Sequence, residues 1–234
     1  MPHGETRVVI ALDTNDLAEA KRLLDATEDK IDFYKVGSIL FTSAGPAAVE
    51  AVTSRRKQVF LDLKFHDIPN TVTGAARAAA GMGVYMFTIH CAGGLEMMRA
   101  ALAGARAGFA AHAGEARPKV LGVTVLTSLA TSEGTAGRVL EYARDAVVAG
   151  LDGVVCSPLE LGQVREAHGK RLLTVVPGIR LAEEGRDDQA RVGTPGRAAR
   201  DGADFIVVGR SVTGARDPRG TLAKVLEEIG TARR

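Results

Sequence analysis

Eight short runs rich in β-branched residues recur along the chain, and each leads into a longer segment with helical spacing. Near-continuous apolar strands that alternate with helices are typical of a parallel sheet covered on both faces. The expected strands are 7–13, 31–37, 58–64, 84–90, 119–127, 152–157, 172–178 and 204–210. The clearest expected helices are 16–27, 72–83, 138–150 and 218–230.

Eight strand–helix units in 234 residues match a closed (β/α)8 barrel. An open, doubly wound sheet is the main alternative, but no Gly-x-Gly-x-x-Gly follows the first expected strand. No linker, low-complexity segment or break in composition divides the chain. We therefore predict the α/β class and a (β/α)8 TIM barrel that forms a single domain over residues 1–234.

The overall charge is nearly balanced, with 30 Lys and Arg against 28 Asp and Glu. A nucleic-acid or membrane surface would need a clustered basic excess, so neither partner is expected. No apolar run approaches the roughly 18 residues of a spanning helix, and residues 1–13 do not resemble a signal peptide. Cys91 and Cys156 are isolated, which suits a reducing compartment. These features predict a soluble, cytoplasmic protein.

Polar residues stand at the C-terminal end of every expected strand. In a (β/α)8 barrel these ends meet at one mouth, where the active site forms. In chain order the residues are Asp13, Lys35, Asp62 with Lys64, His90, Thr127, Ser157, Pro177 leading to Arg180, and Gly209 with Arg210.

The third strand carries the most informative stretch, LDLKFHDIPN at 61–70. Asp62 and Lys64 are two residues apart, so both side chains lie on one face of the strand and point into the barrel mouth. Asp67 follows in the loop. A structural ion pair at the rim is the alternative, but buried ion pairs rarely return their desolvation cost. Charges in such a place are more often kept for chemistry.

A second constellation lies near the C-terminal end of the chain. Gly209 lets the backbone approach an anion, Arg210 can bind it bidentately, and a helix follows. The long connection 177–196 could close over a phosphate through Arg180 and Gln189. An ordinary turn and a merely mobile surface loop are the alternatives.

Other candidates are weaker. His66 and His90 could act in proton transfer, although a lone histidine near a barrel rim more often satisfies local hydrogen bonds. No His and carboxylate group has metal-ligand spacing, so we predict no metal. No Ser or Cys lies in a recognisable nucleophile context.

Taken together, the motifs resemble the bacterial type of the orotidine 5′-phosphate decarboxylase family over nearly the whole chain. The resemblance is carried by ALD at 11–13, KVG at 35–37, DLKFHDIPNTV at 62–72, VTVLTS at 123–128, PGIR at 177–180 and GADFIVVGRSVTGARDP at 202–218. The Asp-x-Lys-x-x-Asp core is shared with aldolase-like hexulose-phosphate synthases, and the combination with the other motifs is more specific. Ser211 and Leu181 depart from the family, which usually has proline at both positions.

The resemblance implies a cofactor-free decarboxylation of orotidine 5′-monophosphate to uridine 5′-monophosphate. Lys64 would protonate C6 of the pyrimidine and Asp62 would lie against the substrate carboxylate. Lys35, Asp62, Lys64 and Asp67 would form an alternating network of charges. The remaining implied substrate contacts are Asp13 and Lys35 for the ribose, Asp67 and Thr71 for the neighbouring subunit's ribose, Thr127 for the pyrimidine, Arg180, Gln189, Gly209 and Arg210 for the phosphate end, and additionally Ile68 and Pro177.

The resemblance also implies a homodimer with shared active sites. Two rival functions remain open at this point. A hexulose-phosphate synthase would use a divalent metal and need further acidic ligands at the strand ends. A non-catalytic nucleotide-binding barrel would keep Arg210 and Gln189 but would not need Lys64.

Overall fold

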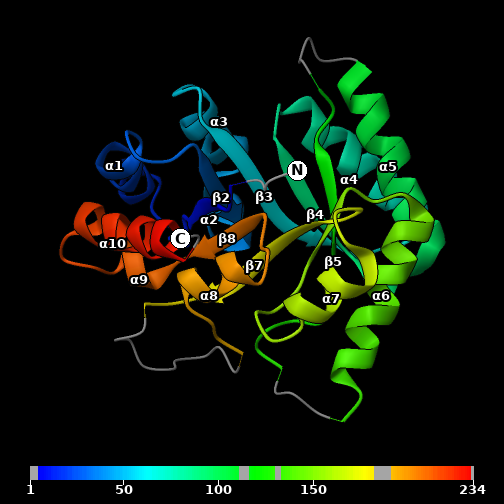
Figure 1. The fold of residues 1–234 in the computed structure, drawn as a ribbon. Coiled ribbons are helices and arrows are strands. Elements are labelled where there is room, and N and C mark those ends of the chain that lie inside the picture. The colour runs from blue at the N-terminus through cyan, green and yellow to red at the C-terminus, as the bar shows by residue number, and fades with distance from the viewer. Residues whose placement is uncertain (1–4, 111–115, 130–132, 182–190, 233–234) are drawn as a thin grey trace.

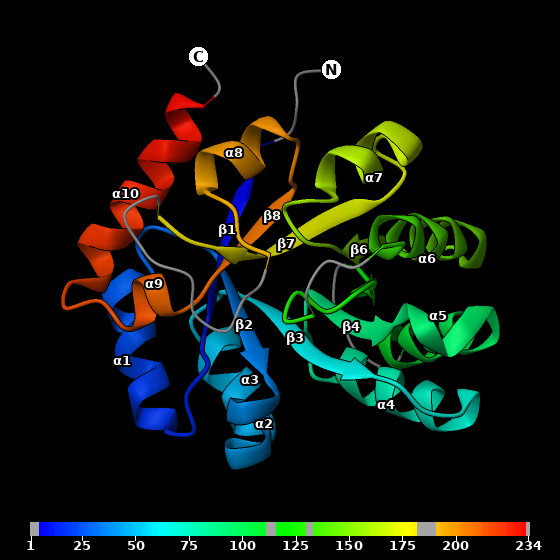
Figure 2. The ribbon, with the colours of Figure 1, turned by 90° about the horizontal axis from the view of Figure 1, so that it is seen from below.

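The computed structural model describes residues 5–110, 116–129, 133–181 and 191–232. Eight parallel strands pair in chain order, and β8 pairs with β1 to close a barrel. Figure 2 shows the strands in the middle and the helices arranged around them. The predicted (β/α)8 TIM barrel is thus confirmed, and the open-sheet alternative is wrong.

All eight expected strands are present (Figure 1). Their bounds are β1 Arg7–Ala11, β2 Phe33–Gly37, β3 Gln58–Phe65, β4 Met86–His90, β5 Lys119–Val123, β6 Gly153–Val155, β7 Leu173–Ile179 and β8 Phe205–Val208. Four strands end earlier than expected, β1, β6 and β8 by two residues each and β5 by four. Thr127 lies four positions beyond the end of β5, and Ser157 lies two beyond the end of β6, so both belong to connections.

Helices cover the outside of the barrel. They are α1 Leu17–Thr27, α2 Ser38–Ala44, α3 Pro46–Thr53, α4 Pro69–Gly81, η1 Cys91–Gly93, α5 Gly94–Ala110, α6 Thr135–Ala149, α7 Leu161–His168, α8 Pro195–Arg200, α9 Arg210–Thr213 and α10 Pro218–Thr231. Local chemistry explains several of their starts. Asp16 caps α1 by accepting from the Ala18 N–H, and Asp217 caps α10 in the same way. Pro218 opens α10, as expected for a first-turn proline.

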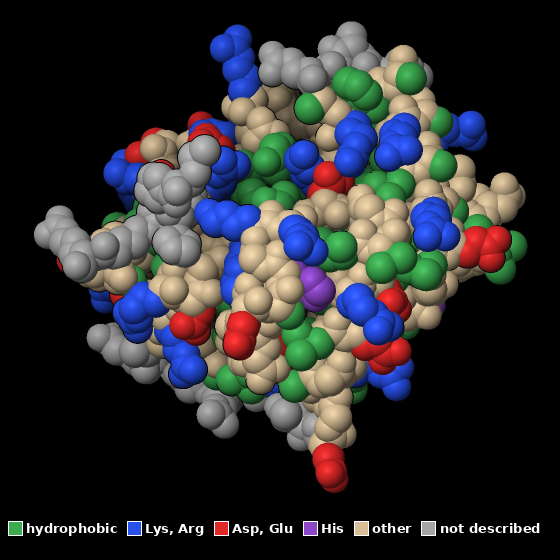
Figure 3. Space-filling model, turned by 45° about the vertical axis from the view of Figure 1, so that its right-hand side comes forward, with side chains coloured by type: hydrophobic (Ala, Val, Ile, Leu, Met, Phe, Trp, Pro, Cys, Tyr) green, Lys and Arg blue, Asp and Glu red, His purple; other side chains and the backbone are tan. Residues whose placement is uncertain are grey.

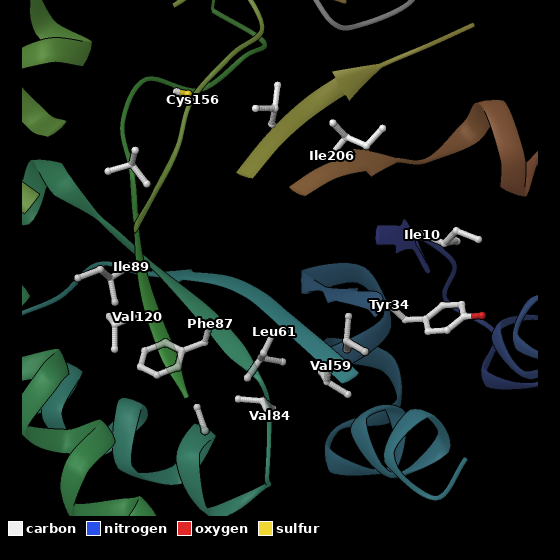
Figure 4. Packing of buried hydrophobic residues seen from close by; sticks show 14 of the residues in the cluster. Ile10, Tyr34, Val59, Leu61, Val84, Phe87, Ile89, Val120, Cys156 and Ile206 are labelled. Atoms are coloured by element: carbon white, nitrogen blue, oxygen red, sulfur yellow. The ribbon is translucent and has the colours of Figure 1, made fainter. Parts of the chain in front are cut away.

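Strand alternation divides the core into two layers. In β1, Val8 and Ile10 pack outward against the helices, whereas Val9 and Ala11 fill the barrel interior. Figure 4 shows part of the outer layer, including Ile10, Tyr34 and Leu61 on the successive strands β1, β2 and β3. Because both faces of each strand are buried, the strands read as continuous apolar runs in the sequence.

Aromatic residues fill the N-terminal end of the barrel interior. Phe33 makes edge-to-face contacts with Tyr85 and Phe205, with ring centroids 5.1 and 5.2 Å apart. The Arg7 guanidinium lies 5.4 Å from the Phe33 centroid and covers this end. The barrel is therefore packed at its N-terminal end, which leaves the C-terminal end for a binding site.

The lengths and polarity of the helices, and the distribution of surface charge, bear on possible membrane contact. Within the described ranges, no helix is both long enough and apolar enough to cross a bilayer. On the face in Figure 3, Lys and Arg side chains are spread over the surface, with acidic and neutral groups among them.

Candidate active site

A cavity of about 460 Å³ opens at the C-terminal ends of the strands. Its deeper wall is apolar and consists of side chains from the barrel interior, among them Ala11, Phe60, Val155 and Val207. Charged side chains from β1, β2 and β3 project over this apolar surface. Charges in such surroundings interact more strongly than they would in water.

Four of these charges alternate in sign along the cavity wall. The Lys35 Nζ lies 2.7 Å from the Asp13 Oδ1 and 3.9 Å from the Asp62 Oδ2. The Lys64 Nζ lies 2.8 Å from the same Asp62 oxygen. The Asp62 side chain is only 12% exposed and the Lys35 side chain 11%, whereas Asp13 and Lys64 are 43% and 34% exposed, so the network is buried at its centre and open at its two ends. Asp62 serves as a shared counter-ion for two ammonium groups.

The backbone at Lys64 is irregular. Its φ is 52°, a left-handed conformation that costs an ordinary residue about 1–2 kcal/mol. The register between β3 and β4 shifts between Leu61 and Phe65, so a bulge surrounds Lys64. The expected rule, that residues two apart on a regular strand share one face, therefore does not by itself explain why Lys64 lines the cavity beside Asp62. The bulge turns it there.

Thr88 holds this irregular backbone in place, and the sequence reasoning missed it. Its hydroxyl accepts from the Lys64 N–H at 2.9 Å and donates to the Asp62 Oδ1 at 2.9 Å. Thr88 is fully buried in the middle of β4. The sequence signal for Thr88 is one polar residue among apolar neighbours, two positions before His90, the candidate for proton transfer.

Gly37 is required by the close packing of the network. A Cβ at this position would lie 2.9 Å from the Lys35 Nζ and 3.1 Å from the Asp13 Oδ1. Gly37 also pairs with Asp62 in the sheet register. Any larger residue here would push Lys35 and Asp13 apart.

The end of the cavity near β7 and β8 is rich in arginine. Pro177, Gly178 and Arg180 line it from β7, and Gly209 and Arg210 line it after β8. The helix after Gly209, α9, has only four residues, so the guanidinium groups and not a helix dipole would supply most of the attraction for an anion. Gln189, which was expected to close over a phosphate together with Arg180, lies outside the described residues.

An apolar wall faces the charges from the connection after β5. Thr127 lines the cavity together with Val125 and Leu126, and Ile39 contributes from α2. This surface suits one face of a flat ring, with the Thr127 hydroxyl as a polar group at its edge.

Asp67, Ile68 and Thr71 do not line the cavity of their own chain. All three are exposed, Asp67 and Ile68 on the turn between β3 and α4 and Thr71 in the first turn of α4. The Asp67 Oδ1 accepts from the Ile68 N–H at 2.6 Å. Within one chain the alternating charges are thus Asp13, Lys35, Asp62 and Lys64. The expected participation of Asp67 in such a network stays a prediction, because it involves the neighbouring subunit's site.

The remaining candidates lie at the margin of the site. His66 and His90 have ring centroids 5.3 Å apart and do not line the cavity. Burial lowers the pKa of His90, and the neighbouring His66 and Lys64 lower it further. Cys156 does line the cavity, but burial raises the pKa of its thiol to about 12, so it is a poor nucleophile. No cluster of three or more His, Cys, Asp or Glu that could hold a metal ion occurs within the described ranges.

Comparison with known proteins places this geometry in a family. Residues 6–225 match the profile described as "Orotidine 5'-phosphate decarboxylase / HUMPS family". An orotidine 5′-phosphate decarboxylase of Moorella thermoacetica is 44% identical, over 97% of this chain and 93% of that protein. One of Anaeromyxobacter dehalogenans is 49% identical, over 91% of this chain and 93% of that protein. The crystal structure of the Lactobacillus acidophilus orotidine 5′-phosphate decarboxylase superposes with a TM-score of 0.83 at 36% identity, covering 96% of this chain and 99% of that chain.

Proposed function

The chain belongs to the orotidine 5′-phosphate decarboxylase / HUMPS family, and from this membership we propose how its cavity carries out the reaction. The enzyme is a carboxy-lyase of pyrimidine biosynthesis that converts orotidine 5′-monophosphate to uridine 5′-monophosphate and carbon dioxide. The observation that supports the residue roles is the Lys64 ammonium held 2.8 Å from Asp62 over an apolar wall.

Lys64 is the group that meets the reacting carbon. When the bond between C6 and the carboxylate breaks, the electron pair stays on C6 in an orbital in the plane of the ring. The ring does not delocalise that pair, so a fixed positive charge beside C6 stabilises it. The Lys64 ammonium then donates a proton to C6, and the neutral amine regains a proton from water.

Asp62 has two effects in this scheme. It orients Lys64, because its Oδ2 accepts from the Lys64 Nζ while its Oδ1 accepts from Thr88. Its negative charge beside the substrate carboxylate also raises the energy of the bound substrate, and this repulsion is relieved as carbon dioxide leaves.

The other cavity residues bind the parts of the substrate that do not react. Asp13 and Lys35 bind ribose hydroxyls, Thr127 contacts the pyrimidine, and Arg180 and Arg210 bind the phosphate, with Pro177 and Gly209 beside them. Binding energy from the distant phosphate can hold the pyrimidine against Lys64 and so lower the barrier. Gln189 is assigned to the phosphate end from the family resemblance.

Turnover of orotidine 5′-monophosphate in the presence of a chelator tests the assignment. We expect the purified protein to consume the substrate, seen as a fall in its ultraviolet absorbance, at the same rate with and without the chelator. A hexulose-phosphate synthase would not consume this substrate. Absence of turnover in a folded sample would contradict the proposed function.

We further propose a homodimer in which each subunit completes the other's site through Asp67, Ile68 and Thr71. The support is that these residues are exposed and point away from their own cavity, although they adjoin the β3 stretch that carries Asp62 and Lys64. Ile68 is an apolar side chain 66% exposed, as expected for a residue that a second copy covers.

Mixed dimers test this sharing. Lys64→Ala and Asp67→Ala chains, each nearly inactive alone, should recover roughly a quarter of wild-type activity when coexpressed, because half of the dimers would contain one intact site in two. Lys64→Ala coexpressed with Lys35→Ala is the matched control, since both residues lie in the same chain's cavity and no intact site can form. Recovery in neither mixture would show that Asp67 does not act across subunits.

A cytoplasmic location is also proposed. It is supported by the two free, buried cysteines, which suit a reducing compartment. Burial raises the thiol pKa of Cys91 as well to about 12, so neither thiol is primed for redox chemistry.

A further inference from the structure

A second buried ionic cluster lies beside the active site and belongs to none of the roles above. Its centre is Arg191, which is 1% exposed and stands just before α8. One of its terminal nitrogens lies 2.6 Å from the Glu160 Oε1. Glu160 is itself 2% exposed, and its other oxygen accepts a hydrogen bond from the buried Ser157.

This one guanidinium joins three connections that are far apart in the sequence. Its second terminal nitrogen donates to the carbonyl oxygens of Val125 at 3.0 Å and of Leu126 at 2.8 Å, in the connection after β5. Glu160 and Ser157 belong to the connection after β6. Arg191 belongs to the connection between β7 and α8.

The backbone around Arg191 is in turn tied to β7. The Arg180 N–H donates to the Gly193 carbonyl at 3.0 Å, and the Gly193 N–H donates to the Gly178 carbonyl at 3.1 Å. Gly193 packs so closely on the β6 connection that a Cβ there would lie 2.6 Å from the Pro158 Cβ. Arg191 is therefore rigidly connected to the end of β7 that carries Arg180.

Stability is a poor explanation for this cluster. A fully buried ion pair is often no better for stability than apolar residues of the same volume. The Arg191 Nε also has no hydrogen-bond partner among the described residues, which is an additional cost of burial. What the cluster does provide is a fixed spacing between two cavity walls. One wall is the segment 125–127, and the other is the segment 177–180, both of which line the cavity.

We propose that Arg191 is a positioning residue that sets the distance between the pyrimidine wall, Val125 to Thr127, and the phosphate wall, Pro177 to Arg180. The assignment of a ligand end to each wall rests on the proposed function. A nucleotide must contact both walls at once, so it benefits when their spacing is preorganised. A ligand that contacts one wall gains nothing from the spacing. Arg191 thus acts on specificity for the whole nucleotide without touching it.

Binding of whole and partial ligands tests the proposal. Arg191→Met keeps an unbranched side chain that reaches about as far as the Arg191 Nε but removes all the hydrogen bonds. We expect the dissociation constant of uridine 5′-monophosphate to rise roughly tenfold or more, because the preorganisation of its two contacts is lost. The dissociation constants of uridine alone and of inorganic phosphate alone should each change less than about twofold. Titration calorimetry at a temperature well below unfolding gives all three.

Arg165→Met is the matched control. Arg165 is another largely buried arginine, paired with Asp204 and bonded to Thr174 at the opposite end of the barrel. The Arg165→Met change should lower Tm, as Arg191→Met also should. It should leave the dissociation constants of uridine 5′-monophosphate, uridine and phosphate within about twofold of wild type. Lowered stability alone therefore cannot reproduce the selective effect.

The outcomes separate clearly. Unchanged nucleotide affinity in folded Arg191→Met, or equal weakening of all three ligands, would overturn the positioning role. If Arg191→Met does not fold, Arg191→Lys is the second variant. Its ammonium keeps the positive charge but cannot reach Glu160 and both carbonyl oxygens at once, so this variant should show the same selective loss of uridine 5′-monophosphate affinity. Wild-type affinities in Arg191→Lys would overturn the proposal. Failure of the proposed function would appear differently, as wild-type protein that does not turn over orotidine 5′-monophosphate.

Discussion

Replacing Lys64 with alanine is expected to lower kcat for orotidine 5′-monophosphate by at least about 10⁴-fold, because one group supplies both electrostatic stabilisation and the proton. The Lys64 Nζ is the ammonium next to Asp62 on the cavity wall, and the other ammonium there, Lys35, is held between Asp13 and Asp62. Affinity for uridine 5′-monophosphate should stay within about tenfold of wild type, since the phosphate and ribose contacts remain. Single-turnover kinetics and a product titration measure the two effects separately.

Lys57→Ala is the control for this change. Lys57 is also paired with an aspartate, with its Nζ 2.9 Å from the Asp32 Oδ1, but it lies just before the opposite end of β3. The Lys57→Ala change should leave kcat within about twofold, because Lys57 does not line the cavity and its partner Asp32 is well exposed. If Lys64→Ala and Lys57→Ala had equally small effects, Lys64 would be a bystander, and a non-catalytic nucleotide-binding barrel would become the better interpretation.

Arg210→Ala is expected to weaken uridine 5′-monophosphate binding by about 2–3 kcal/mol, or roughly 30- to 150-fold, the scale of lost charge-assisted hydrogen bonds. The dissociation constant of uridine, which has no phosphate, should change little. The physical reason is that Arg210 lines the cavity just after β8, whereas the apolar wall at Val125 and Leu126 comes from the connection after β5. Calorimetric titration with both ligands checks the difference.

Arg219→Ala serves as the comparison for Arg210. Arg219 lies in the first turn of α10, is well exposed and pairs with Asp29, away from the cavity. It should leave both affinities unchanged within about twofold. Equal losses for uridine and its monophosphate in Arg210→Ala would mean that the cavity, and not a phosphate contact, had been damaged.

Much of the barrel could be predicted because its causes are local. A parallel strand buried on both faces needs a continuous apolar run, and its crossover needs an amphipathic helix, so the repeat is visible in the sequence. Proximity of Asp13, Lys35, Asp62 and Lys64 followed from one rule of topology, that all parallel strands of a barrel end at the same mouth. The structure brings these four residues together at hydrogen-bond or ion-pair distance.

Details of the site depend on contacts between strands. The bulge that turns Lys64 inward exists because Thr88 on β4 bonds both its N–H and Asp62. Neither residue's own sequence neighbourhood reveals that pairing. The expected role of Asp67 stays a prediction, since Asp67 is exposed on the turn that leads into α4 and its role depends on a second copy of the chain.

The sequence by itself determined the barrel, its order of strands and the mouth at which the charges meet, because apolar periodicity and residue type act over a few neighbouring positions. Only the tertiary structure decided that Thr88 fixes Lys64 and that Arg191 binds the β5 and β6 connections to β7. These outcomes depend on side chains 24 to 66 positions apart meeting in space. No local sequence pattern predicts these contacts, since the free energy that stabilises them comes from burial and side-chain pairing that exist only once the barrel has closed.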